Sequence, residues 1–282
     1  MTFGIDVLAE SLRLAGIVVM ATAIALEWVD GRRYPTLALV STGTVMLAVG
    51  SVAVLLATVL PIARRLEEPV IALALEYFQT TSHGPKLLTP ILPAVYAVLL
   101  AEGLRVVDAP GIRRALCWMM VATLVAALAL MAAAGHVATT RLQHLGMVLQ
   151  IVHMAAGIAW VALVLAMLPR LYRREPLAEI LTRVGNVALA LVVALVATGI
   201  ASAWIHGAPL PWPMNEAYGQ LLLLKSAALA LALVAAGWNR FIELRPPVIN
   251  EPGIRRVLGL ETLVLLTALL LAAWLTRTPP PG

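Results

Sequence analysis

Apolar segments about as long as a membrane is thick recur along the whole chain, separated by short clusters of proline, glycine, arginine and acidic residues. A helix needs ~20 mostly apolar residues to cross the ~30 Å hydrocarbon core of a bilayer. The pattern therefore predicts an all-α, polytopic membrane protein. Eight spanning helices are expected, at residues 7–29, 36–62, 87–107, 115–135, 143–168, 184–206, 217–238 and 257–276.

One apolar stretch between the second and third spans is too short to cross a membrane. Residues 69–80, PVIALALEYFQT, end just before the third predicted helix. Such a segment forms either an interfacial helix or a kinked lead-in to the span that follows.

The composition agrees with a membrane protein and changes how the charge is interpreted. Hydrophobic residues make up 61% of the 282 residues, charged residues only 12%, and the mean hydropathy is +0.93. Soluble domains are usually about half apolar and a quarter charged. The net charge of +5 does not indicate a nucleic-acid partner, because most basic residues lie in loops beside the spans. The expected partner is the lipid bilayer.

A faint internal repeat suggests two halves. The segment TSHGPKLLTPILPAVYAVLLA at 81–101 resembles EAYGQLLLLKSAALALALVAA at 216–236. Four helices separate the two segments, so both halves would have the same orientation in the membrane. We expect two four-helix halves in parallel orientation, 1–140 and 141–282.

The loops differ in basic charge, which predicts the orientation. Thirteen of the twenty lysines and arginines lie in the loops after helices one, three, five and seven, and five lie on the opposite side. The side of the membrane with more lysine and arginine residues should be cytoplasmic. Both termini are therefore expected on the outer, periplasmic side.

All five histidines fall in the outer half of this topology. His83, His136, His144 and His206 lie at the outer ends of their helices, whereas His153 lies nine residues below His144, or ~14 Å deeper. At 100° per residue His144 and His153 point to opposite faces. We expect four histidines around one outward-facing cavity and a separate, deeper His153. The alternative is that neighbouring helices satisfy each histidine by hydrogen bonds.

Two methionines extend the candidate metal site. Met147 follows His144 by three residues, and Met214 lies in the outer loop that begins at His206. Imidazole suits copper, zinc and iron, whereas thioethers select reduced copper. Methionine is also a common filler of apolar gaps.

The charged residues inside predicted spans include Glu10, Arg13, Lys225 and Glu261. Glu10 and Arg13 can pair at i, i+3. Lys225 should face the bundle or a watery cavity, because a charge at mid-membrane is costly, unless it extends to the outer surface. Glu261 is close in sequence to Arg255 and Arg256, with which it can pair. No nucleotide-binding, metalloprotease or hydrolase motif is present, and we do not expect an enzyme.

Several of these residues together resemble the CopD/PcoD copper-resistance family, best over residues 130–282. The matching positions are Gly135-His136, His153 with Trp160, Tyr218-Gly219 with Lys225, Asn239-Arg240 and Glu261. The resemblance implies an eight-helix protein of the bacterial inner membrane, associated with copper uptake and with a periplasmic CopC-type copper carrier. Members often have a further histidine three residues before His153, where this chain has Gln150.

Two functional hypotheses follow, from different classes. In the first, periplasmic copper, expected as Cu(I), binds to His83, His136, His144, His206, Met147 and Met214 and passes inward beyond His153. In the second, two histidines from facing helices are the axial ligands of haem b in a redox or biosynthetic protein. Haem ranks second because His136 and His153 differ in depth. A metal-free accessory subunit is a third interpretation.

The charge distribution predicts the location of the carboxyl terminus. A reporter fused after Gly282 that works only outside the cytoplasm should be active. Thirteen lysines and arginines lie on one side of the membrane and five on the other, and this distribution places the carboxyl terminus on the side with fewer basic residues. A second reporter that works only inside the cytoplasm is the control at the same position. Activity of that second reporter would overturn the placement of the histidines on the outer side.

Overall fold

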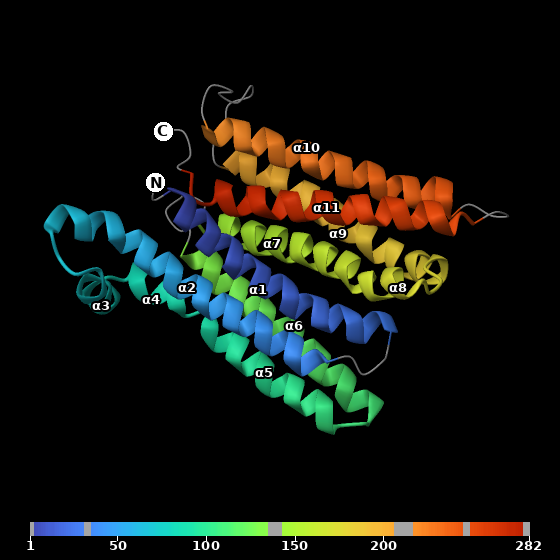
Figure 1. The fold of residues 1–282 in the computed structure, drawn as a ribbon, viewed down its shortest axis with the longest axis horizontal. Helices are drawn as coiled ribbons and strands as arrows, with labels where there is room; N and C mark the ends of the chain where they lie inside the picture. Colours follow the sequence, from blue (N-terminus) through green and yellow to red (C-terminus); the bar gives the residue numbers. More distant parts are fainter. Residues whose placement is uncertain (1–2, 31–34, 135–142, 206–216, 245–248, 279–282) are drawn as a thin grey trace. The chain divides into compact units, whose positions relative to one another are not determined.

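Helices are the only regular secondary structure within the residues that the computed structural model describes, which are 3–30, 35–134, 143–205, 217–244 and 249–278. Within these ranges eight helical segments are long and apolar enough to cross a membrane (Figure 1). The predicted all-α fold with eight spanning helices is confirmed, and the chain is a multi-pass membrane protein. The spans are Gly4–Val29, Thr36–Leu66, His83–Val106, Pro110–Ala133, His144–Arg173, Ala178–Ser202, Ala217–Glu243 and Glu251–Leu275.

Three of these spans contain more than one helical element. α4 and α5 together form the third span, α7 continues into the short α8, and α10 ends in a π-helical turn, η2. The elements are α1 (Phe3–Asp30), α2 (Thr36–Leu66), α3 (Val70–Thr80), α4 (His83–Leu88), α5 (Ile91–Val106), α6 (Pro110–Ala133), α7 (Gln143–Ala166), α8 (Leu168–Arg173), α9 (Ala178–Ile205), α10 (Ala217–Trp238), η2 (Asn239–Glu243) and α11 (Glu251–Leu275).

The chain forms two compact units. Unit 1 comprises residues 1–24 and 35–151, and unit 2 comprises residues 25–34 and 152–282. Unit 1 therefore holds most of α1, all of α2 to α6 and the start of α7, whereas unit 2 holds the remainder of α7 and α8 to α11. The division into halves 1–140 and 141–282, and the repeat behind it, stay predictions.

In unit 1, α1 and α2 approach each other so closely that only glycine fits between them. A Cβ atom on Gly43 would lie 2.5 Å from the Gly16 carbonyl oxygen and 2.6 Å from Met20 Cγ. One heptad further along α2, a Cβ on Gly50 would lie 2.7 Å from the backbone nitrogen of Arg13. Small residues allow such approach in membranes, where packing rather than water exclusion holds helices together.

The short segment between α2 and α4 is a separate helix, α3, joined to α4 by a tight turn. The Thr81 hydroxyl donates to the Tyr77 carbonyl at 2.7 Å and accepts the Gly84 N–H at 3.0 Å. A Cβ on Gly84 would lie 2.7 Å from the Tyr77 carbonyl oxygen. The turn brings the His83 ring edge-on to Tyr77, with ring centroids 6.4 Å apart.

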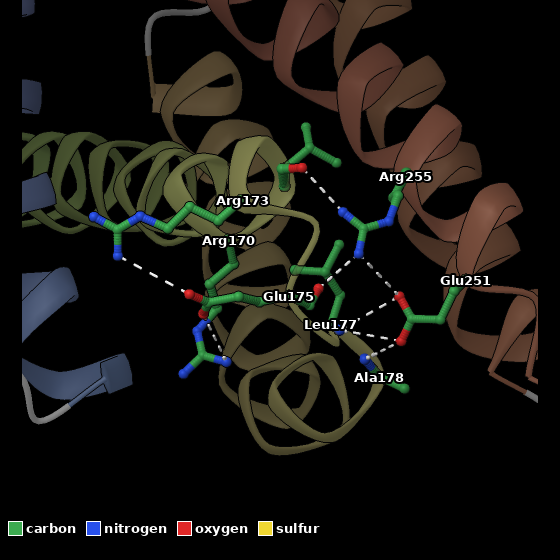
Figure 2. Close-up of polar contacts among 8 residues, drawn as sticks. Arg170, Arg173, Glu175, Leu177, Ala178, Glu251 and Arg255 are labelled. Atoms are coloured by element: carbon green, nitrogen blue, oxygen red, sulfur yellow. Dashed lines mark hydrogen bonds and ion pairs between the residues drawn. The ribbon is translucent and has the colours of Figure 1, made fainter.

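In unit 2, the first turn of α11 holds the connection between α8 and α9 (Figure 2). The Glu251 carboxylate accepts the N–H groups of Leu177 and Ala178, at 3.1 and 3.2 Å from Oε1. Arg255, one turn later, donates to the carbonyl oxygens of Leu171 at 3.0 Å and Glu175 at 2.7 Å. The two N–H groups bound by Glu251 lie at the start of α9, where the first turn of a helix leaves its donors without a partner in the helix.

The close contact of α1 and α2 predicts different effects for two glycine-to-alanine changes. Gly43→Ala should lower the Tm of the purified protein, because the added methyl meets backbone atoms of α1; overpacking of this kind costs about 1–3 kcal/mol. Gly259→Ala in α11 is the matched control, because nothing lies within 4 Å of its added Cβ. Equal Tm values for Gly43→Ala and the unchanged protein would contradict the packing.

Candidate functional site

His153 is held inside unit 2 by the helix opposite it. The residue lies on α7, and its Nδ1 atom is 3.1 Å from the carbonyl oxygen of Leu195 and 3.2 Å from the hydroxyl oxygen of Thr198, both on α9. Its side chain is partly buried, and Thr198 is 8% exposed. Two partners on one helix fix the position and the plane of the ring.

These contacts also decide which ring nitrogen carries the proton. A carbonyl oxygen can only accept, so Nδ1 must be the protonated nitrogen that donates to Leu195. The Thr198 hydroxyl already donates to the Ala194 carbonyl at 2.6 Å, so its oxygen is an acceptor for the same N–H. In this tautomer of the neutral ring, Nε2 has a lone pair. The chemistry of Nε2 is that of a metal ligand or a proton acceptor.

A glycine on α9 makes room for the ring. A Cβ on Gly199 would lie 3.3 Å from His153 Cε1, which is tighter than ordinary van der Waals contact. One turn after His153, a Cβ on Gly157 would lie 3.4 Å from a methyl group of Leu195. α7 and α9 therefore pack closely at the level of His153.

A cation lies near this histidine. Lys225, on α10, is close enough to His153 for the two side chains to interact electrostatically, and it is half-buried. This agrees with the expectation that an intramembrane lysine turns toward the protein interior. Three helices, α7, α9 and α10, thus contribute to the surroundings of His153.

A second buried polar contact on α7 lies seven residues further along. Trp160, 1% exposed, donates its indole N–H to Glu261 Oε1 on α11 at 3.2 Å, and Glu261 is 4% exposed. The sequence suggested that Glu261 pairs with Arg255 and Arg256; among the described residues it instead accepts from Trp160, and Arg255 binds the α8–α9 connection. At 100° per residue, seven residues bring Trp160 to the same face as His153.

The sequence did not single out Thr198 or Leu195, and it did not connect Trp160 with Glu261. A backbone carbonyl carries no side-chain signal, and threonine on an apolar helix commonly bonds to its own helix. The i, i+3 pair of Glu10 and Arg13, by contrast, is confirmed, with 3.0 Å between Glu10 Oε2 and Arg13 Nη1. Local spacing determines that pair, whereas the others depend on which helices meet.

The remaining predicted ligands are spread over the chain. His83 opens α4, His144 is exposed at the start of α7, and Met147 lies one turn after it, half-buried. Among the residues described, no three His, Cys, Asp or Glu side chains come close enough to hold a metal ion. His136, His206 and Met214 lie outside the described residues. The shared outer site therefore stays a prediction.

Comparison with known proteins yields one match. Residues 178–275 match the model of the family CopD, described as Copper resistance protein D. No curated protein and no solved structure matches the chain. The matched segment runs from the first residue of α9 to the last residue of α11. It includes Thr198, Gly199, Lys225 and Glu261, whereas His153 and Trp160 precede it. The resemblance to the CopD copper-resistance family is thereby confirmed for the last three spanning helices of this membrane protein.

Proposed function

We propose that this protein handles copper in the bacterial inner membrane, binding it on the periplasmic side and moving it toward the cytoplasm. His83, His136, His144 and His206, with Met147 and Met214, are the proposed ligands for capture. His153 is the proposed deeper step. Copper is the cargo in this proposal, and no chemical reaction on a substrate is part of it.

The hydrogen bond from His153 Nδ1 to Leu195 is the observation that carries this proposal. Histidines that bind metals usually donate their second ring N–H to a carbonyl or carboxylate, which fixes the tautomer and orients the lone pair. His153 has this arrangement inside a membrane span. A purely structural histidine would make the same bond, and the His153→Ala variant described below distinguishes the two roles.

The surroundings of His153 bear on whether copper would be stored or passed on. Lys225 on α10 lies near this histidine, and a positive charge there would oppose prolonged residence of a copper ion. Imidazole and thioether ligands at the entrance would suit Cu(I). A periplasmic CopC-type carrier is the proposed donor of copper to the outer ligands, in keeping with the CopD resemblance.

The proposal predicts different defects for the two histidines of α7. His153→Ala should leave copper capture at the cell surface largely intact and slow its delivery to the cytoplasm. His144→Ala should weaken capture itself, because His144 lies at the exposed start of the helix. The measurement is surface-bound and cytoplasmic copper over time in cells that express each variant equally.

Val152→Ala provides the matched control, because Val152 is the neighbour of His153 and is 40% exposed. Normal delivery in well-expressed His153→Ala cells would show that this histidine has only a structural role. The absorption spectrum of the purified protein separates the two classes of function. A Soret band would favour the haem-b alternative, and bound copper without that band would favour copper handling.

The hydrogen bonds to His153 predict a smaller effect for Thr198→Val. This change removes one of two acceptors, and loss of a partner behind a metal ligand typically costs 10–100-fold in affinity or activity. Because the Leu195 carbonyl remains, we expect delivery of copper to the cytoplasm to slow by about 10-fold, with surface capture unchanged. Thr262→Val is the control, because Thr262 also donates only to its own helix, to Leu258 at 2.8 Å. Equal delivery rates for Thr198→Val and Thr262→Val would contradict the role of Thr198.

A further inference from the structure

The helix α3 has three different faces around its axis. On the first face, Ala74 is 6% exposed and packs with Leu73 and Tyr77 against neighbouring helices of unit 1. On the second face lie the exposed apolar side chains of Ile71, Leu75 and Phe78. The third face carries exposed polar side chains, which are Glu76, Gln79 and Thr80.

The apolar stripe has the geometry of one continuous surface. Ile71, Leu75 and Phe78 are spaced i, i+4 and i+7, so they fall within about 60° of one another around the helix. They are 71%, 58% and 37% exposed. At 100° per residue the stripe lies between the packed face and the polar face. Going around the axis of α3, the face that packs against the protein is therefore followed by the exposed apolar stripe and then by the exposed polar face.

The packing of α3 places it at the level where the spans begin. Its buried face belongs to a cluster with Val54 and Val59 of α2, Leu87 of α4 and Ala9 of α1. Ala9 lies five residues inside the α1 span, which starts at Gly4. This cluster is therefore close to one edge of the apolar zone of the protein.

The length and direction of α3 fit a position along this edge. Eleven residues extend ~16 Å, about half the thickness of a hydrocarbon core. In Figure 1 α3 is seen almost end-on, whereas α2 runs across the view, so α3 lies crosswise to α2. A short helix that crosses the direction of the spans cannot insert through the membrane.

We propose that α3 lies in the membrane interface and that phospholipid acyl chains cover the stripe of Ile71, Leu75 and Phe78. A helix in this position has one face on lipid and the opposite one on water, with apolar side chains about 5–10 Å into the headgroup and acyl boundary. The neighbouring polar face, with Glu76 and Gln79, then contacts headgroups and water.

This contact with lipid has a consequence for the helix that follows. The turn after α3 holds the His83 ring against Tyr77, and Gly84 contacts the backbone of Tyr77 and Phe78. Lipid that fixes α3 therefore also fixes the start of α4. The proposal itself does not depend on copper binding.

Spin labels on the full chain in phospholipid vesicles test the proposal. In a Cys117→Ala background, single cysteines replace Ile71, Leu75 or Phe78 on the stripe and Gln79 or Thr80 on the polar face. Leu99, 63% exposed on α5, is the lipid-facing control. Collision rates with oxygen, which concentrates in lipid, and with a water-soluble nickel chelate are measured for each label.

Labels on the stripe should show an oxygen-to-nickel collision ratio severalfold higher than the labels at Gln79 and Thr80, at a depth about 5–10 Å below the headgroups. Ile71→Cys and Thr80→Cys form the decisive pair, because nine residues at 100° each place them on opposite sides of the same helix, and both are exposed. Equal ratios at these two positions would overturn the proposal in favour of a helix in water. Low collision rates with both reagents on the stripe would overturn it in favour of protein contact.

Discussion

Within a membrane, buried polar groups must find hydrogen-bond partners inside the protein, because lipid offers none. The described part of unit 2 follows this constraint closely. His153 bonds to a carbonyl and a hydroxyl of α9, Trp160 bonds to Glu261, and Glu251 accepts two N–H groups at the start of α9. Each bond joins two different helices, so each also determines which helices are neighbours. The exceptions include Asn239, whose buried side-chain amide has no partner among the described residues.

The same constraint explains the chemical character of His153. A buried ring that must satisfy its own N–H has only one nitrogen left for other chemistry. The α9 carbonyl takes the Nδ1 proton, and Nε2 has the lone pair. A residue that packs in this environment thus also presents an oriented lone pair, and the copper handling that we propose would use that orientation.

Packing without water depends on close approach. In unit 1, glycines at the α1–α2 crossing bring two backbones into contact, and in unit 2 Gly199 admits the imidazole ring. Glycine, which has no side chain, occupies the few positions where a backbone atom or the imidazole ring of another helix takes the space of a Cβ atom. Elsewhere large apolar side chains remain exposed, as on α5 and α9, which is expected where lipid is the neighbour.

The sequence by itself determined the eight spans, the Glu10–Arg13 pair and the resemblance to CopD, because each depends on local composition, spacing or a motif. Only the tertiary structure decided that His153 meets Leu195 and Thr198, that Trp160 meets Glu261 across 101 residues, and that Arg255 binds the α8–α9 connection. Leucine- and alanine-rich helix faces resemble one another, so sequence periodicity does not specify which pairs of helices touch. The polar partners are chosen when particular helices pack, and a hydrogen bond between helices forms only once that packing has brought donor and acceptor within reach.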